Sequence, residues 1–263
     1  VAFGFGVIIG SFLNVYIYRF HTGKSLAGSS HCLSCGTPLR WFELFPLVSY
    51  LALRGRCRTC GSRIPARYFL VESGTASLFA FALLLTGDVF VLLLWWLAMA
   101  ILVVIFVYDL DHFIIPDSLT LALTGTALAL QLHALTQTGW VAEPFLWDTF
   151  AAVGGGLFFL LLWVLSKGQW IGFGDVKLAL PLGWLVGWEN VFSFIVLSFW
   201  IGAGISLLLI AFQSWQKRGK ATLPKQQAGL TMKSAVPFAP FLVSSALVVL
   251  FTRFNVLDLF SFI

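Results

Sequence analysis

Charged side chains are scarce in this chain of 263 residues. Asp, Glu, Lys and Arg make up 10% of the sequence, whereas hydrophobic residues make up 59% and the mean hydropathy is +0.94. So little charge excludes an ordinary soluble protein, because soluble domains average about 25% charged residues. The composition instead predicts an integral membrane protein that is surrounded by lipid.

Long apolar runs recur along the whole chain. A membrane-spanning helix needs about 17–25 apolar residues, and eight runs reach or approach that length. They cover residues 1–18, 69–86, 89–108, 118–133, 146–166, 177–188, 190–212 and 236–252. The sixth run is short, and Pro181, Gly183 and Gly187 predict a broken or tilted helix there. We therefore expect an all-α fold, a polytopic membrane helix bundle of about eight transmembrane helices.

Lysine and arginine are almost absent from one set of loops. With eight spans, the loops 19–68, 109–117, 167–176 and 213–235 share one side and, together with Lys177 at their edge, hold 15 of the 16 basic residues. The positive-inside rule makes this side cytoplasmic. The net charge of +5 and the pI near 9.2 are then a signal of membrane topology. We expect lipid contact and no nucleic-acid partner.

Two aspartates are expected at the same membrane depth. Asp109 ends the third span in "VYDLDHFIIPD", and Asp175 precedes the sixth span in "GFGDVKLA". Ionisable groups at a membrane boundary are costly unless they are paired or hydrated, so the two predict a shared site. Paired carboxylates cannot both ionise readily, so one can act as an acid while the other activates water. The alternative is that each is an ordinary helix cap or a solvated group.

Several residues near this pair are candidates for supporting roles. Gly172 and Gly174 leave space for close approach of backbone or substrate beside Asp175. Asp117 follows Pro116 and precedes the fourth span, a position that favours a helix N-cap over a role at the site. Asp111 and His112 either support the pair or lie in water at the membrane edge. Lys177 completes the supporting set. We do not expect His112 to bind a metal, because no second ligand lies at helical spacing from it.

Cysteine is also scarce, and all four cysteines fall in one loop. They form two C-x2-C pairs, each followed by glycine: Cys32, Cys35, Cys57 and Cys60. Thiolates at this spacing predict a tetrahedral Zn2+ site without an open position, which is a structural site. Two disulfides are the alternative, but thiols on the cytoplasmic side stay reduced. We expect zinc to organise a small cytoplasmic loop domain at 21–67, between a first helix at 1–20 and a seven-helix core at 68–263.

Glycines inside the spans predict close helix packing. Gly6 and Gly10 form a G-x3-G pattern in the first span, which favours contact with another helix. Gly154, Gly155 and Gly156 suggest similar packing of the fifth span, against a helix that carries an aspartate.

Six stretches appear in an order that resembles a known family. They are "GSFLNVYIYR" at 10–19, "LRGRCRTCG" at 53–61, "RYFLVES" at 67–73, "DLDHFIIPD" at 109–117, "GFGDVKLA" at 172–179 and "VPFAPFL" at 236–242. Together they resemble the type IV prepilin peptidases, the bifunctional leader peptidase/N-methyltransferases of bacterial inner membranes. The likeness covers nearly the whole chain.

The resemblance implies a function. Family members are GxGD intramembrane aspartyl proteases that cut the basic leader from prepilins and pseudopilins at the cytoplasmic face. They then methylate the new N-terminus with S-adenosylmethionine. The catalytic pair maps onto Asp109 and Asp175, and Gly55 is a candidate supporting residue of the methyl-donor site; its alternative is a tight turn. Two other functions stay open: a peptidase with a purely structural zinc loop, and a transporter that uses the carboxylates as a proton relay.

The sequence departs from the family pattern in three places. "SLAGSSHC" lacks the proline and arginine that usually precede the first cysteine pair, "GFGD" replaces "GMGD", and "PFAP" replaces "PFGP". An apolar replacement beside Asp175 should leave proteolysis intact. Because all four cysteines are present, we expect both activities rather than the peptidase alone.

Overall fold

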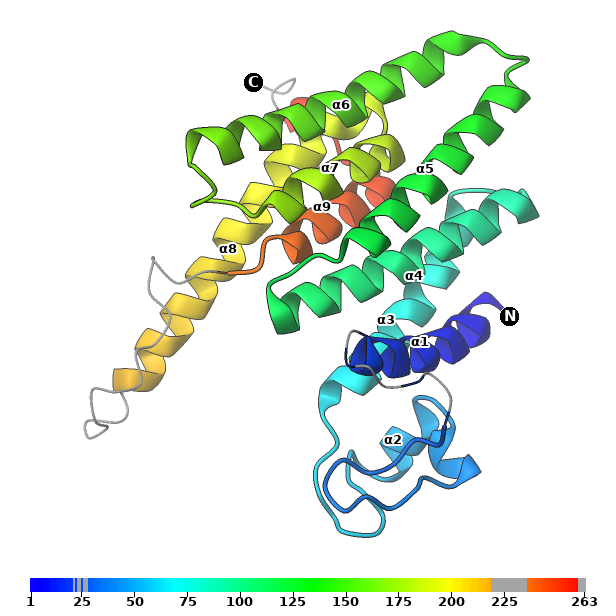
Figure 1. Cartoon of the computed structure of the whole chain (residues 1–263), viewed down its shortest axis with the longest axis vertical. Helices are drawn as coiled ribbons and strands as arrows, with labels where there is room; N and C mark the ends of the chain where they lie inside the picture. Colours follow the sequence, from blue (N-terminus) through cyan, green and yellow to red (C-terminus); the bar gives the residue numbers. More distant parts are fainter. Residues whose placement is uncertain (21, 23–24, 26–27, 219–235, 260–263) are drawn as a thin grey trace. The chain divides into compact units, whose positions relative to one another are not determined.

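The computed structural model describes the whole chain except residues 21, 23–24, 26–27, 219–235 and 260–263. Lys24, Lys220, Lys225 and Lys233, which entered the topology argument, lie outside the described residues. The fold is all-α, as predicted, and the described residues contain helices and two isolated β-bridges but no strand. The helices are α1 (Ala2–Arg19), α2 (Val48–Ala52), α3 (Ala66–Phe81), α4 (Val89–His112), α5 (Asp117–Gln137), α6 (Ala142–Leu165), α7 (Phe173–Val186), α8 (Val191–Arg218) and α9 (Ala239–Thr252) (Figure 1).

Every predicted span overlaps one α-helix of the structure, but the helices differ from the spans in length and bounds. Within the described residues, five candidate spans are long and apolar enough to cross a membrane: α1, α4, α5, α6 and the stretch Trp188–Phe212, which includes most of α8. Helices α3, α7 and α9 have 16, 14 and 14 residues, fewer than the ~17 that a perpendicular span requires. The multi-pass membrane character is therefore supported, whereas the count of eight spans is not confirmed.

Contacts divide the chain into two compact units, Val1–Val107 and Tyr108–Ile263. In the first unit, α1 packs along α3. A Cβ atom on Gly6 would lie 2.7 Å from the Ala76 Cα, and one on Gly10 would lie 2.8 Å from the Glu72 Cα. Only glycine permits so close an approach of two backbones, so the G-x3-G prediction is confirmed.

Helix α7 lies at the centre of the second unit and contacts α5, α6, α8 and α9 (Figure 1). Its closest neighbour is α6, because a Cβ on Gly183 would lie 2.6 Å from the Ala152 Cα. Gly156 of α6 faces Leu180 of α7, and Gly155 lies near Val191 of α8 and the Ala179 carbonyl oxygen of α7. A Cβ on Gly154 would meet nothing within 4 Å, so the predicted close packing holds for two of the three glycines. The site residues at the start of α7 are thereby fixed by surrounding helices.

Of the two predicted alternatives for the sixth span, a broken or a tilted helix, the break is wrong. The helix continues through Pro181 and ends at Gly187, which has a φ of +76°. Proline removes one N–H and crowds the preceding turn, but packing on several neighbours keeps the helix whole. Leu178, Ala179 and Leu182 are fully buried around this point.

Candidate functional site

Asp109 lies on the last turn of α4, in the second unit. The turn ends at Phe113, whose φ of +57° takes the chain out of the helix, while its N–H still bonds to the Asp109 carbonyl. The Asp109 side chain is buried, and its Oδ2 accepts a hydrogen bond from the Ala239 N–H over 3.2 Å. Ala239 is the first residue of α9, so the N-terminus of that helix points one of its free N–H groups at the carboxyl.

Asp175 occupies the first turn of α7 and is also buried. Its backbone N–H donates to the Gly172 carbonyl over 3.2 Å, and the Gly172 N–H donates to the Asp175 Oδ2 over 3.1 Å. This reciprocal pair resembles a capping box and fixes the carboxyl at the helix start. Gly174 packs against Ile115, because an added Cβ would lie 3.1 Å from the Ile115 Cβ. The predicted need for small residues beside Asp175 therefore has a physical reason.

The structure brings Asp109 and Asp175 together in one unit, where the two carboxyl groups interact electrostatically. Neither forms an ion pair among the described residues. Two buried carboxyls that repel each other when both are charged favour a state in which only one of them is ionised. Such a pair has the groups that acid–base hydrolysis requires: one donor and one acceptor of protons.

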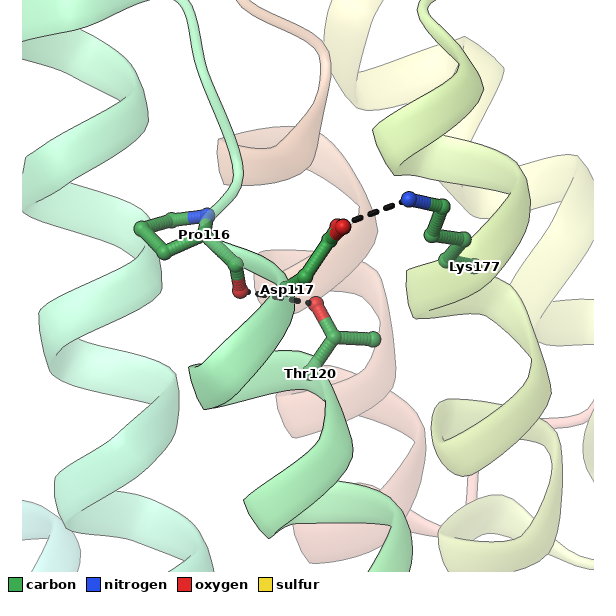
Figure 2. A network of polar contacts seen from close by, with 4 residues as sticks. All are labelled: Pro116, Asp117, Thr120 and Lys177. Atoms are coloured by element: carbon green, nitrogen blue, oxygen red, sulfur yellow. Dashed lines mark hydrogen bonds and ion pairs between the residues drawn. The ribbon is translucent and has the colours of Figure 1, made fainter.

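Asp117 and Lys177 form an ion pair rather than the predicted cap (Figure 2). Pro116 is the N-cap of α5, and Asp117 is the first helical residue. The Asp117 Oδ1 accepts a hydrogen bond from the Lys177 Nζ over 2.7 Å, so α5 is joined to α7 two residues after Asp175. Both side chains are partly exposed, and such pairs contribute about 0–1 kcal/mol. The prediction that Asp117 caps α5 is wrong, because Pro116 is the N-cap and the Asp117 side chain pairs with Lys177 instead.

Asp111 and His112 are exposed on the last turn of α4. The His112 ring stacks on Tyr108 at 4.2 Å, and its Nδ1 lies 3.2 Å from the Tyr108 carbonyl. These contacts hold the imidazole on its own helix. The supporting role of Asp111 stays a prediction.

The four cysteines cluster in the first unit. None forms a disulfide, and their Sγ atoms all lie within 4.8 Å of one another. The Cys32 and Cys60 Sγ atoms are 3.9 Å apart, close to the ~3.8 Å edge of a tetrahedron with Zn–S bonds of about 2.3 Å. This cluster can hold zinc, and the donor set fits it.

The two cysteine pairs repeat one local structure. The Cys32 N–H bonds to the Thr37 carbonyl and the Cys57 N–H to the Ser62 carbonyl, while Gly36 and Gly61 both have a φ of +70°. Left-handed glycines permit the turn that aims N–H groups at the first sulfur. Hydrogen bonds from the Cys35 and Ser34 backbone lower the pKa of the Cys32 thiol to about 6, which favours the thiolate that binds metal.

Gly55 is explained by the turn that leads into the second cysteine pair. Its φ is +65°, and a Cβ there would lie 2.9 Å from the Tyr50 hydroxyl oxygen. The Gly55 N–H bonds to the Tyr50 carbonyl, and the Gly55 carbonyl accepts from the Ile64 N–H. Only glycine fits this position comfortably, so the turn alone accounts for the residue and its link to the methyl donor stays a prediction.

Two site features were missed by reasoning from sequence. Ala239 contributes only its backbone N–H, and the quoted stretch "VPFAPFL" gave no sign of which group would meet Asp109. Glu72 is buried on α3, where its Oε2 accepts a hydrogen bond from the Leu47 N–H over 2.8 Å. Its signal was available, because a lone carboxylate within an apolar run is costly and marks a functional position.

The fold and site define a helical membrane protein that buries paired carboxyl groups and carries a four-cysteine cluster. Residues 5–86 match the model of the bacterial peptidase A24 N-terminal domain, and residues 96–207 match that of the type IV leader peptidase family. No solved structure matches the chain.

Characterised relatives agree with these matches. The chain is 31% identical to a prepilin leader peptidase/N-methyltransferase of Burkholderia pseudomallei strain 1026b, over 94% of the chain and 82% of the relative. It is 34% identical to a protein of the same name from Aeromonas hydrophila, over 80% of the chain and 81% of the relative. It is also 34% identical to one from Myxococcus xanthus, over 79% of the chain and 62% of the relative. The chain belongs to the prepilin leader peptidase/N-methyltransferase family.

Proposed function

We propose that this protein removes the basic leader of type IV prepilins or pseudopilins at the cytoplasmic face of the bacterial inner membrane, and then methylates the new N-terminal residue. The buried pair of Asp109 and Asp175 is the observation that carries the proposal. Family membership supports a protease, and the pair provides the only two buried aspartates among the described residues. The distribution of lysine and arginine supports the cytoplasmic orientation.

In the proposed reaction the two carboxyl groups divide the work. The ionised aspartate takes a proton from water, and the resulting hydroxide attacks the scissile carbonyl carbon. The protonated aspartate donates its proton to the carbonyl oxygen, and the pair later protonates the leaving amine. The Ala239 and Gly172 N–H groups hold one oxygen of each carboxyl, which leaves the other oxygens for water and substrate.

Methyl transfer requires groups that the aspartate pair does not supply. S-adenosylmethionine would provide the methyl group on a positively charged sulfur, and the amine released by cleavage would accept it. The cysteine cluster would hold zinc as a structural centre, because four thiolates fill its coordination sphere. Zinc would then organise the loop that joins α1 and α3.

A transporter is less consistent with the geometry. Proton-coupled transporters place their carboxylates near the membrane midplane, often at broken helices. Asp109 is on the last turn of a 24-residue helix, and Asp175 is on the first turn of α7. Both positions are at helix ends, where substrate can arrive from an aqueous face.

The test is leader removal from a co-expressed prepilin. Asp109→Asn and Asp175→Asn should each abolish cleavage while the protein stays in the membrane at its normal level. Asp111→Asn, on the same turn of α4 as Asp109 but exposed, is the comparison variant and should retain some activity if Asp111 only supports the pair. Near-normal processing by either of the first two variants would refute the assignment.

A further inference from the structure

A cavity of about 220 Å3 lies between residues 30–65 of the cysteine loop and the adjoining parts of α1 and α3, entirely within the first unit. Its lining combines apolar side chains with a few polar groups from three helices. The polar and aromatic groups from these helices include Ser11, Asn14, Ser49, Tyr50, Tyr68 and Glu72, and the cysteine loop adds others, among them Cys32 and Cys57 of the cysteine cluster. The cavity is separate from the aspartate pair in the chain, and the proteolytic reaction uses none of its residues.

Glu72 is the unusual member of this lining. Its side chain is buried, and its recorded partners are neutral: the Leu47 N–H and the side chains of Ser11 and Asn14. No lysine or arginine in the described part of the chain forms an ion pair with it. A buried carboxylate without an opposite charge is unfavourable, and a cation in the adjoining cavity would relieve this cost.

Docking of the cysteine loop does not by itself explain the carboxylate. The Leu47 N–H needs an acceptor, because Leu47 has an unusual φ of +60° and its N–H meets no helix carbonyl. A glutamine carbonyl oxygen would accept the same hydrogen bond without burying charge. The hydrogen bond to Leu47 therefore does not by itself account for a glutamate at this position.

Other groups around the cavity define the ligand more closely. Tyr50 and Tyr68 line the cavity, although the Tyr50 ring already packs against Phe69 and the Arg67 guanidinium lies over the Tyr68 ring. Aromatic rings attract organic cations and stack on flat rings. Arg58 and Arg63 also line the cavity and can attract a carboxylate. The lining thus suits an organic cation that also carries an aromatic group and a carboxylate.

We propose that this cavity binds the sulfonium methyl donor, with Glu72 facing its positive charge. The proposal rests on the methyltransferase part of the proposed function and locates the methyl-donor site in this cavity. S-adenosylmethionine has the three required features: a sulfonium, an adenine ring and an amino-acid carboxylate. Pockets that enclose a whole drug-sized ligand start near ~300 Å3, so this cavity encloses part of the donor and leaves the rest in the opening.

The first test compares ligand binding by the full-length protein in detergent, measured by calorimetry. Glu72→Gln should weaken binding of S-adenosylmethionine at least tenfold, but should weaken binding of S-adenosylhomocysteine much less, because that product lacks the sulfonium charge. Zinc content and leader cleavage should stay at wild-type levels, which shows that the variant is folded. Glu189→Gln, an exposed-loop substitution in the other unit, should change neither affinity.

A second pair of variants tests the cavity without altering Glu72. Ser49 lines the cavity on α2, whereas the neighbouring Val48 is 66% exposed and does not line it. Ser49→Trp should fill the space and abolish donor binding, while Val48→Trp should bind normally. Both variants should keep their zinc and their cleavage activity.

The outcomes separate this inference from the proposed function. Unchanged donor binding in Glu72→Gln and Ser49→Trp, with methylation intact, would overturn the cavity assignment alone. Equal weakening of both ligands by Glu72→Gln would overturn the placement of Glu72 at the sulfonium. If the wild-type protein neither bound the donor nor methylated a cleaved pilin, the methyltransferase part of the proposed function would fail, and the inference with it.

Discussion

Single atoms of the backbone decide much of the chemistry at the aspartate pair. Asp109 receives its hydrogen bond from Ala239 and Asp175 from Gly172, and both donors are N–H groups at the start of a helix. Donors of this kind depend on position and not on side-chain identity. That explains why alanine can stand in "PFAP" and phenylalanine in "GFGD" without removing a contact to either carboxyl.

The cysteine cluster leads to a prediction at the same scale. Cys35→Ser or Cys60→Ser should release zinc, since three thiolates and a hydroxyl bind the metal far more weakly than four thiolates. Metal analysis of the purified protein measures this directly. Limited proteolysis should then cut the loop more readily at residues 21–67.

Ser62 provides the matched control for these variants. Its hydroxyl lies 3.1 Å from the Cys60 Sγ but would not be a zinc ligand, so Ser62→Ala should retain the metal. Retention of zinc by a cysteine variant would contradict the site. So would a wild-type protein with two disulfides and no metal.

At the scale of helices, glycine contacts set the position of the catalytic elements. Helix α7 carries Asp175 at one end and Gly183 two turns later, where it meets α6. A displacement of α7 at Gly183 would therefore also move Asp175, because both residues belong to one rigid helix. Close packing of this kind tolerates added atoms poorly.

Gly183→Ala should accordingly destabilise the protein and lower leader cleavage. The new Cβ would lie 2.6 Å from the Ala152 Cα, and overpacking of this kind costs about 1–3 kcal/mol. Thermal unfolding in detergent and the cleavage rate measure the two effects. Gly154→Ala, in the partner helix, is the control, because its Cβ would meet no atom within 4 Å and should leave both quantities unchanged. Equal behaviour of the two variants would refute this packing argument.

At the scale of the whole molecule, the sequence predicted the main architecture. Hydropathy located the eight long helices, and the G-x3-G pattern predicted the packing of α1 on α3. Lengths were harder to predict, because hydropathy detects apolar character while caps and turns decide where a helix ends. Helices α3 and α9 are consequently shorter than their apolar runs, whereas α7 begins four residues before its run and is longer than it.

The site was predicted where side-chain chemistry was distinctive and missed where it was not. Four cysteines at fixed spacing and two aspartates beside apolar runs are visible in the sequence. The N–H of Ala239, the Lys177 ion pair of Asp117 and the cavity beside Glu72 depend on residues distant in the chain. Only the folded structure brings these groups together.

The division of the chain predicts that the two activities can be separated. Asp109→Asn should still methylate a pre-cleaved peptide, because the amine of that peptide is already free. Gly55→Ala should leave cleavage largely intact but reduce methylation, since its Cβ would displace Tyr50, which lines the cavity. Mass spectrometry of the pilin N-terminus reads both activities. Loss of methylation in a folded Asp109→Asn protein would contradict the separation.

The central claim is that Asp109 and Asp175 act as one catalytic unit, and a comparison of single and double variants tests it most directly. Residues that act together lose nearly all activity when either is removed, so their effects do not add. The cleavage rate constant of Asp109→Asn/Asp175→Asn, measured on a purified prepilin, should be no lower than that of either single variant. Additive losses, or substantial cleavage by either single variant, would contradict the claim.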